Sequence, residues 1–353
     1  MTDLYDVLSR TDKPVVMYGM GNGADKILKV LSERGIAVSD FFASDGFVRG
    51  HFFHGKKVLT YAQVSEKYDD FTVLVAFGSS LEDVAENVRR IARERELYIP
   101  DVPVCGENIF DKSFYNSNSD EIMRARSCFA DERSREVFDL IIEYKLTGRA
   151  DILEKSVDSD GGDSLLDYRN YGVICDAGAY NGDTARKFIR ENPNVKKIYA
   201  LEPDRRSFRK LSEYAGSEKR VIPLNIGAWD KEESVSFRSQ GNRNSGIGDG
   251  DECAFASIDA ITAGDTVDLI KYDVEGAELQ ALTGSKRTIS RCRPSLYISA
   301  YHRSEDIFTL PLFIARRYPF YSMYLRKKPG FPAWDIDLIC LPDRVESLRA
   351  LGK

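Results

Sequence analysis

The 353-residue sequence predicts an α/β protein with two Rossmann-like units, the smaller one N-terminal. An apolar run leads into a glycine-bearing turn at residues 14–24, and the same arrangement recurs at residues 173–184. Apolar runs then alternate with helical patterns after each turn. Strand, turn, helix and strand in succession form one crossover unit of a parallel sheet. We predict an N-terminal domain over residues 1–112, a helical linker over 113–168 and a second domain over 169–353.

The N-terminal domain begins with a buried strand at residues 14–18, and further strands are expected at 38–43 and 71–77, with an amphipathic helix at 81–96. Gly19, Gly21 and Ala24 match a dinucleotide fingerprint, and Asp45 follows at a distance suited to a ribose contact. A domain that binds nothing, or only pairs with a partner, explains the same glycines. A nucleotide-sugar oxidoreductase or epimerase working at this turn is therefore one alternative function, although residues 1–110 contain no Tyr-x-x-x-Lys pair.

The linker contains one polar stretch and one helical pattern. Residues 114–120 are polar and predict a loop, whereas Asp131 is placed to cap a helix that Gly148 ends. The apolar residues of this helix have i, i+3, i+4, i+7 spacing. Packing between the domains explains that stripe most simply, and a lid over the second domain is the alternative.

The second domain should contain a series of parallel strands followed by an antiparallel pair. The strands are expected at residues 173–176, 198–202, 221–225, 268–274 and 295–301, and the pair at 320–325 and 337–341. Residues 240–251 are rich in glycine and asparagine, which predicts a loop that either closes over a ligand or forms a solvated hairpin tip.

The first two strand ends of this domain carry the candidate donor site. Asp176 ends the first strand, and Gly178, Tyr180 and Asn181 follow it in a turn where glycine lets a ligand approach the backbone. Glu202 at the next strand end suits the two hydroxyls of a ribose. No phosphate-loop motif occurs, and a carboxylate in the first loop repels phosphate but suits the cationic amino-acid end of S-adenosylmethionine. The pattern favours a methyl-donor site over tight loops that serve packing alone.

Three further residues are candidates for catalysis. A hydroxyl acceptor needs a base near the nucleophile, and His302, which follows a strand, is the first choice. Asp273 and Glu275 lie two apart at another strand end, where they can orient the acceptor or act as base. Lys271 in the same strand can neutralise them. These carboxylates alone do not fix a metal coordination sphere, so no metal site is predicted.

Six segments in order resemble the FkbM family of S-adenosylmethionine-dependent methyltransferases, over about residues 130–341: 176–179, 201–203, 225–228, 257–259, 270–278 and 298–302. The resemblance implies a class I methyltransferase sheet of seven strands, the last antiparallel, with donor and acceptor above the strand ends. It also implies that Asn225 and Ile226, with Asp259, lie near the adenine of the donor. The main hypothesis is an O-methyltransferase acting on a hydroxyl of a sugar, glycan or small metabolite. A non-catalytic binding module with the same fold is the remaining alternative.

Composition limits the partners that we expect. A net charge of −6 argues against a generic nucleic-acid binder, and no apolar run is long enough to span a membrane. The chain starts without a signal-peptide pattern, and its six cysteines are scattered without a Cys-x-x-Cys pair. We expect a cytoplasmic protein whose partner is a small-molecule or saccharide acceptor, with no nucleic acid and no membrane. The oligomeric state stays open.

Overall fold

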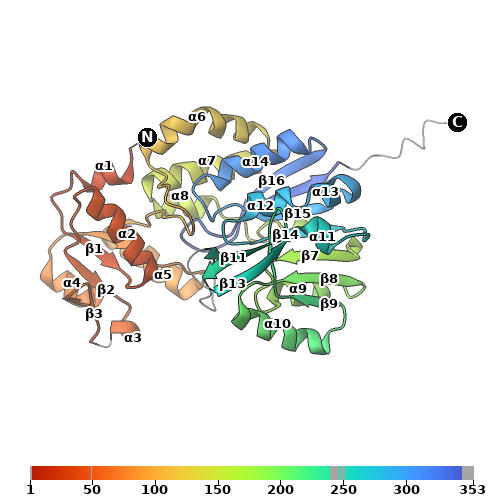
Figure 1. Ribbon diagram of the computed structural model, residues 1–353. Helices are drawn as coiled ribbons and strands as arrows, with labels where there is room; N and C mark the ends of the chain where they lie inside the picture. Colours follow the sequence, from red (N-terminus) through yellow and green to blue (C-terminus); the bar gives the residue numbers. More distant parts are fainter. Residues whose placement is uncertain (1, 49, 239–245, 248–250, 344–353) are drawn as a thin grey trace.

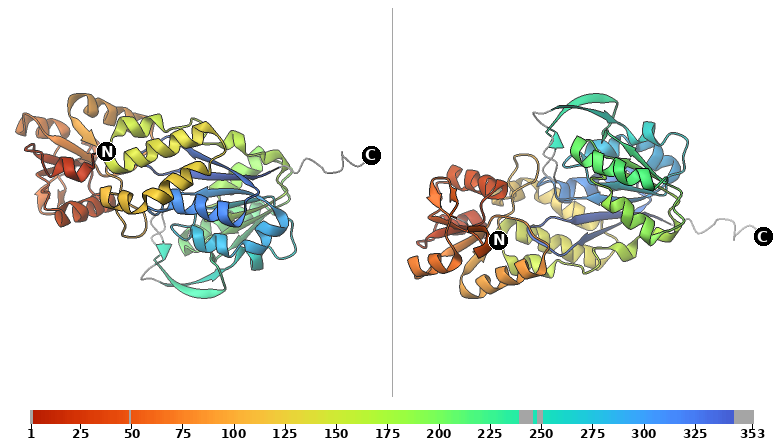
Figure 2. Two further views of the ribbon diagram at one scale, coloured as in Figure 1. Left: turned by 90° about the horizontal axis from the view of Figure 1, so that it is seen from above. Right: turned by 90° about the horizontal axis from the view of Figure 1, so that it is seen from below.

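The computed structural model describes residues 2–48, 50–238, 246–247 and 251–343 (Figure 1). The views in Figure 2 show an elongated molecule with the N-terminal part at one end and the larger C-terminal part at the other. The predicted loop at residues 240–251 lies largely outside the described residues.

The N-terminal part is built on a four-stranded parallel sheet in the order β2-β1-β5-β6. Its strands are β1 (Val15–Tyr18), β2 (Asp40–Phe42), β5 (Thr72–Val75) and β6 (Glu96–Tyr98). Its helices are α1 (Leu4–Leu8), α2 (Asn22–Glu33), α3 (Asp45–Val48), α4 (Tyr61–Lys67) and α5 (Glu82–Glu94), and β3 (Phe52–Phe53) pairs with β4 (Lys56–Lys57) in a hairpin. Every residue of β1 and β5 is buried, as parallel strands covered on both faces require. The predicted smaller Rossmann-like unit is confirmed, with β6 as a strand that the sequence did not predict.

Three helices follow: α6 (Lys112–Ser127), α7 (Glu132–Thr147) and α8 (Ala150–Lys155). Helix α6 shows that the loop predicted at 114–120 is wrong. The side chain of Asp111 caps α6 by accepting from the N–H of Phe114, and only Ile122 and Ala125 of this helix are buried. A helix this polar has little apolar periodicity, which is why the sequence pattern did not reveal it. Helix α7 is as predicted, with Asp131 as N-cap and Gly148 in the left-handed conformation at φ 64° after its last residue.

The C-terminal part contains a seven-stranded sheet in the order β16-β17-β15-β14-β7-β8-β9. All its neighbouring strands are parallel except that β17 runs antiparallel to both β15 and β16. This confirms the expected class I methyltransferase sheet with its last strand antiparallel. The strands are β7 (Val173–Ala177), β8 (Lys197–Leu201), β9 (Val221–Leu224), β14 (Leu269–Tyr272), β15 (Ser295–Ser299), β16 (Tyr321–Lys327) and β17 (Ile336–Pro342).

Short helices and a second small sheet surround this sheet. The helices are α9 (Asp183–Glu191), α10 (Arg205–Ser217), α11 (Ile258–Ile261), α12 (Glu278–Thr283), α13 (Lys286–Cys292) and α14 (Asp306–Arg317), and 3₁₀ turns form at Asp163–Leu165 and Tyr168–Asn170. The small sheet has the order β10-β13-β11-β12, from β10 (Gly227–Ala228), β11 (Glu233–Arg238), β12 (Gly246–Ile247) and β13 (Asp251–Ala256). The sequence analysis named none of these strands, although β11 and β13 pair antiparallel on either side of the segment expected as a loop or hairpin tip.

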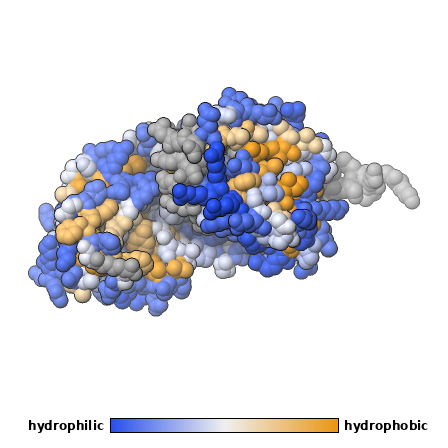
Figure 3. All heavy atoms as spheres, turned by 60° about the horizontal axis from the view of Figure 1, so that its bottom comes forward, coloured by the Kyte–Doolittle hydropathy of each residue, from blue (hydrophilic) through white to orange (hydrophobic). Residues whose placement is uncertain are grey.

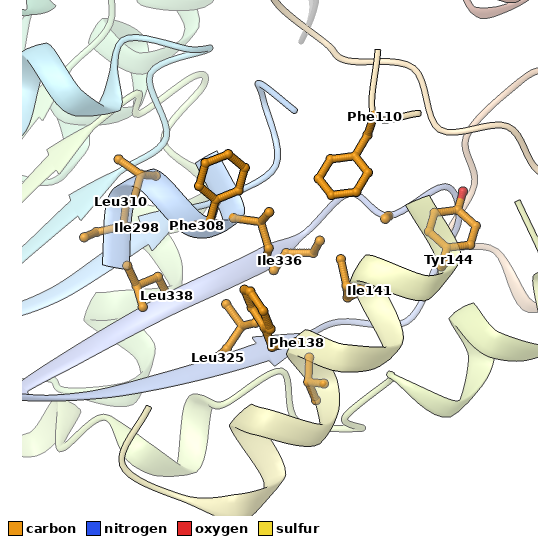
Figure 4. Close-up of a cluster of buried hydrophobic side chains, with 14 of the residues drawn as sticks. Phe110, Phe138, Ile141, Tyr144, Ile298, Phe308, Leu310, Leu325, Ile336 and Leu338 are labelled. Carbon is orange, nitrogen blue, oxygen red and sulfur yellow. The ribbon is translucent and has the colours of Figure 1, made fainter. Parts of the chain in front are cut away.

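Helices α7 and α14 and the strands β16 and β17 share one hydrophobic core (Figure 4). Phe138 and Ile141 of α7 pack with Leu325 of β16 and Leu338 of β17, and all four side chains are buried. Burial of such a side chain stabilises a fold by about 1.5–3 kcal/mol. The apolar stripe of α7 therefore packs in the core against β16 and β17 of the second domain, where the sequence had suggested packing between the domains.

The surface is mixed in character. Figure 3 shows hydrophilic residues separating smaller hydrophobic areas on one face. Within the described residues, no helix combines the length and the apolar composition that crossing a bilayer requires.

Candidate active site

A cavity of about 220 Å³ lies at the carboxyl ends of β7, β8, β14 and β15. It brings together five of the residues proposed from the sequence: Gly178, Tyr180, Glu202, Asp273 and Glu275. The carboxyl edge of a parallel sheet is where α/β proteins bind their ligands. The cavity therefore contains both donor-side and acceptor-side candidates.

Gly178 forms the first turn after β7. Its φ is +87°, and a Cβ there would overlap the carbonyl oxygen of Asp273. The N–H groups of Gly178 and Ala179 both donate to the carbonyl of Leu201, at 3.0 and 2.9 Å. The glycine is thus required by the approach of the protein's own backbone, where the sequence had suggested the approach of a ligand.

Glu202 ties the two donor-side loops together. Its carboxylate accepts from the N–H of Tyr180 and from the N–H of Asp204, each at 2.8 Å, and the side chain still borders the cavity. Burial raises the pKa of Glu202 to about 8, against the lowering effect of these two N–H groups. In the ionised form, each carboxylate oxygen keeps a second lone pair for a ligand hydroxyl.

Asp176 is fully buried and does not line the cavity. Its Oδ1 lies 3.2 Å from Nζ of Lys271, which also donates to the carbonyl of Gly178 at 3.0 Å and lies 3.4 Å from Oδ2 of Asp273. Burial raises the pKa of Asp176 to about 6, although Lys271 opposes this rise. Asp176 is connected to the cavity through Lys271, which lines it. The direct contact between Asp176 and the donor that the sequence predicted is therefore not supported by its position.

The other donor-side candidates support loops around the cavity without lining it. Asn225 donates to the carbonyls of Glu202 and Pro203, at 2.8 and 3.1 Å, and Ile226 is partly buried against the core. Asn181 accepts from Arg186 through its backbone carbonyl at 3.0 Å. Asp259 caps α13 by accepting from the N–H groups at positions 287 and 288. The adenine contacts implied by the family resemblance therefore do not follow from the positions of Asn225, Ile226 and Asp259.

His302 lies behind the acceptor-side carboxylates, with only 1% of its side chain exposed. Its Nδ1 lies 2.8 Å from Oε1 of Glu278, and its Nε2 lies 3.5 Å from Glu275 and 3.6 Å from Asp273. Burial lowers the pKa of His302, but the three carboxylates outweigh burial and raise it to about 10. An imidazolium that is shielded from the cavity cannot accept a proton from a substrate, so this geometry argues against His302 as general base.

Asp273 is the better placed acid–base candidate. A third of its side chain is exposed, it borders the cavity, and it accepts from Oγ of Ser299 at 3.1 Å. Burial raises its pKa, but Lys271 and His302 outweigh that effect and hold it at about 2. Glu275 borders the same part of the cavity, in a left-handed backbone conformation at φ 51°. Both carboxylates thus face the space where an acceptor can lie.

Several lining residues were not predicted: Thr184, Phe255, Tyr297, Tyr301, Lys328 and Asp335. Thr184 follows the glycine turn, so the sequence pattern could have identified it. Lys328 and Asp335 lie in the connection between β16 and β17, and they reach the cavity only because β17 inserts beside β15. Nothing in their local sequence signals that placement.

Two of the three glycines in the N-terminal turn, Gly19 and Gly23, have packing reasons, whereas a Cβ at Gly21 would meet nothing within 4 Å. A Cβ at Gly19 would lie 2.9 Å from the ring of Phe77, and one at Gly23 would lie 2.6 Å from the carbonyl oxygen of Ala76. Ala24 is buried in α2, and Asp45 is exposed at the start of α3. These positions supply no specific observation in favour of the oxidoreductase alternative.

Comparison with known proteins agrees with this fold. Residues 176–321 match the family model described as the methyltransferase FkbM domain. The solved structure of methyltransferase FkbM from Methylobacillus flagellatus KT superposes with a TM-score of 0.75 at 21% identity, covering 95% of this chain and 92% of that one. Aeropyrum pernix fibrillarin, solved with bound S-adenosyl-L-methionine, reaches a TM-score of 0.36 at 14% identity over 51% of this chain and 71% of that one, too little to carry an argument. No curated protein matches the chain.

Proposed function

We propose that the chain, whose residues 176–321 match the model of the methyltransferase FkbM domain, transfers a methyl group from S-adenosylmethionine to a hydroxyl of a sugar, glycan or small metabolite. One observation carries the proposal. The cavity at the strand ends combines a buried ribose-type carboxylate, Glu202, with two acceptor-side carboxylates, Asp273 and Glu275.

The residues present suit the donor. Glu202 is held by two backbone N–H groups so that it borders the cavity, which is the arrangement needed to accept from both ribose hydroxyls. Gly178 and Tyr180 supply the turn beside it, and Phe255 supplies an apolar side chain in the same cavity. The lining contains five carboxyl groups and three lysines, and this acidic balance suits a sulfonium and an ammonium group better than a phosphate.

When bound, S-adenosylmethionine supplies an electrophilic methyl group with a good leaving group. The protein aligns the acceptor and limits water in the cavity. The Asp273 carboxylate would accept a hydrogen bond from the acceptor hydroxyl and orient it. With a pKa of about 2 it is a weak base, so it would take up the proton once methylation has made that oxygen strongly acidic. Lys271 and His302 keep Asp273 ionised through their positive charges.

A saccharide acceptor fits the remaining lining. Tyrosine side chains at positions 297 and 301 lie in the same cavity as the carboxylates at 273, 275 and 335. Carboxylates accept from hydroxyl groups, and aromatic rings pack against the C–H faces of sugars. We also propose that the protein acts in the cytoplasm, as expected from its sequence.

An activity assay that measures both products tests the proposal. The purified chain is incubated with S-adenosylmethionine and a panel of mono- and oligosaccharides, and S-adenosylhomocysteine and methylated product are measured by mass spectrometry. We expect formation of both in equal amounts with at least one hydroxyl acceptor. In Asp273→Asn the rate should fall by roughly 10²–10⁴-fold, the usual contribution of a proton-accepting group. Product formed equally fast by Asp273→Asn would contradict the assigned role.

A further inference from the structure

The N-terminal part touches the C-terminal part on the acceptor side of the cavity. Backbone hydrogen bonds join Ser79, just after β5, to Phe331 in the β16–β17 connection: Ser79 N–H donates at 2.9 Å and Phe331 N–H returns at 3.0 Å. The ring of Phe331 packs edge-on against Phe77, with centroids 5.8 Å apart. These contacts involve the strand end where a Rossmann-like domain would present a ligand-binding loop.

The connection between β16 and β17, residues 328–335, is fixed at both of its ends. Lys328 N–H donates to the carbonyl of Asp335 at 3.0 Å and closes the loop. Lys327 is fully buried, and its Nζ donates to the carbonyls of Lys328 and Gly330, at 2.8 and 2.9 Å. Because Lys327 is the last residue of β16, these hydrogen bonds connect the loop backbone to the sheet. A displacement of one part of the loop should therefore shift the rest of it.

One face of this loop contacts the N-terminal part and the other face lines the cavity. A Cβ at Gly78 would overlap the ring of Trp334, so the ring lies directly against the Gly78 backbone. The next residue, Asp335, lines the cavity in a left-handed conformation at φ 53°, and Lys328 lines it from the other end of the loop. Asp335 therefore follows directly on a residue in contact with the N-terminal part, whereas the ammonium group of Lys328 is also held by Asp337 at 2.8 Å.

A second contact reaches the same side. Lys26 of α2 donates to the carbonyls of Pro103 and Val104, at 2.9 and 2.7 Å, and holds the segment that follows β6. From that segment, Cys105 N–H donates to the carbonyl of His302 at 2.8 Å and its Sγ donates to the carbonyl of Glu275 at 3.1 Å. Two independent contacts thus run from the N-terminal part to residues beside Asp273, Glu275 and Asp335.

We propose that the N-terminal domain determines acceptor specificity: its strand ends hold the 328–335 loop so that Lys328 and Asp335 form the acceptor wall of the cavity. The inference rests on the proposed methyl transfer. It assigns to the Rossmann-like unit a positioning role, with Gly78 and Ser79 acting on Trp334 and Phe331 of the loop. The expected ligand of Asp335 is a hydroxyl group of the acceptor, because a carboxylate accepts from such groups.

Gly78→Leu and Ser79→Pro in the full chain test the proposal. The first displaces Trp334 and the second removes the N–H that bonds Phe331. Gly46→Leu, in the same domain, is the matched control, because a Cβ at Gly46 meets nothing within 4 Å. Two measurements are made on folded protein: hydrogen exchange of peptides over residues 328–335, and the Kd of S-adenosylhomocysteine by titration calorimetry.

Both variants should exchange the loop amides about tenfold faster or more, with the Kd changed by less than about twofold and the control unaffected. With the best saccharide of the acceptor screen, KM should rise about tenfold with little change in kcat. Unchanged loop exchange, or a loosened loop with an unchanged KM, would overturn the proposal. A parallel loss of S-adenosylhomocysteine affinity would also overturn it, because the loop would then serve the donor. A wild-type chain that binds no S-adenosylhomocysteine would instead refute the proposed function, and loop exchange would still decide the structural coupling.

Discussion

Nζ of Lys271 lies 3.2 Å from Oδ1 of Asp176, and both side chains are buried beneath the turn that borders the cavity. The same ammonium group lies 3.4 Å from Asp273. One buried cation therefore connects the end of β7 with the end of β14, the two strand ends between which donor and acceptor would meet.

Replacing Lys271 by Met should destabilise the protein by about 3–5 kcal/mol, because it leaves buried carboxylates without their cation. The loss should be larger at pH 8 than at pH 5. The pKa of Asp176 is already raised to about 6, so at the lower pH this carboxyl takes up a proton and its burial costs less. Urea unfolding followed by circular dichroism measures the difference. Asp176→Asn combined with Lys271→Met should recover part of the loss, and full additivity of the two single losses would contradict the pairing.

The imidazole of His302 should stay protonated well above neutral pH. Its pKa is raised from 6.5 in the unfolded chain to about 10 in the folded one by Glu278, Glu275 and Asp273. A raised histidine pKa contributes stability that is fully present below pH 6.5 and is lost as the pH rises through 10. His302→Gln should therefore cost more stability near pH 6 than near pH 10, measured by urea unfolding.

Nuclear magnetic resonance gives a direct check on the same group. The chain has three histidines, so the His302 signal is assigned by its loss in His302→Gln. Titration of that signal near 6.5 would show that the three carboxylates do not hold the proton and would restore His302 as a base candidate.

Two glycine substitutions should have opposite effects. Gly178→Ala forces a Cβ into the Asp273 carbonyl at φ +87°, so it should lower stability by more than about 1 kcal/mol. Gly216→Ala meets nothing within 4 Å and lies inside α10, where it should raise stability by about 0.5–1 kcal/mol. Thermal unfolding of the two variants measures both effects, and an equal Tm for them would contradict the role of the β7 turn.

Much of the fold follows from short-range pattern in the sequence. The strands ending at Asp176 and Glu202 are short apolar runs followed by turn residues, and the terminal antiparallel pair has the same signature. Helix α6 did not follow, because its polar residues hide the periodicity; the cap at Asp111 was the signal available.

The site was predictable only in part, because strand ends can be read along the chain but neighbours across the sheet cannot. Glu202 and Asp273 border the cavity because they follow the strands β8 and β14, whose ends could be read from the sequence. Lys328 and Asp335 reach it through the insertion of β17 between β15 and β16, which no local pattern encodes. His302 was also expected beside the acceptor, but its ring is buried behind Asp273 and Glu275, with Nδ1 hydrogen-bonded to the buried Glu278, a contact that the sequence does not reveal.

The most direct test of the central claim is calorimetric titration of S-adenosylhomocysteine into the wild-type chain, Glu202→Gln and Glu213→Gln. Glu213 is exposed on α10 and serves as the matched control. The account predicts that the wild-type chain binds, that the control matches it within about twofold, and that Glu202→Gln loses about 1–3 kcal/mol of binding free energy, roughly tenfold or more in Kd. Equal affinity of Glu202→Gln and wild type, with both folded, would contradict the claim that the carboxylate at the end of β8 holds the donor.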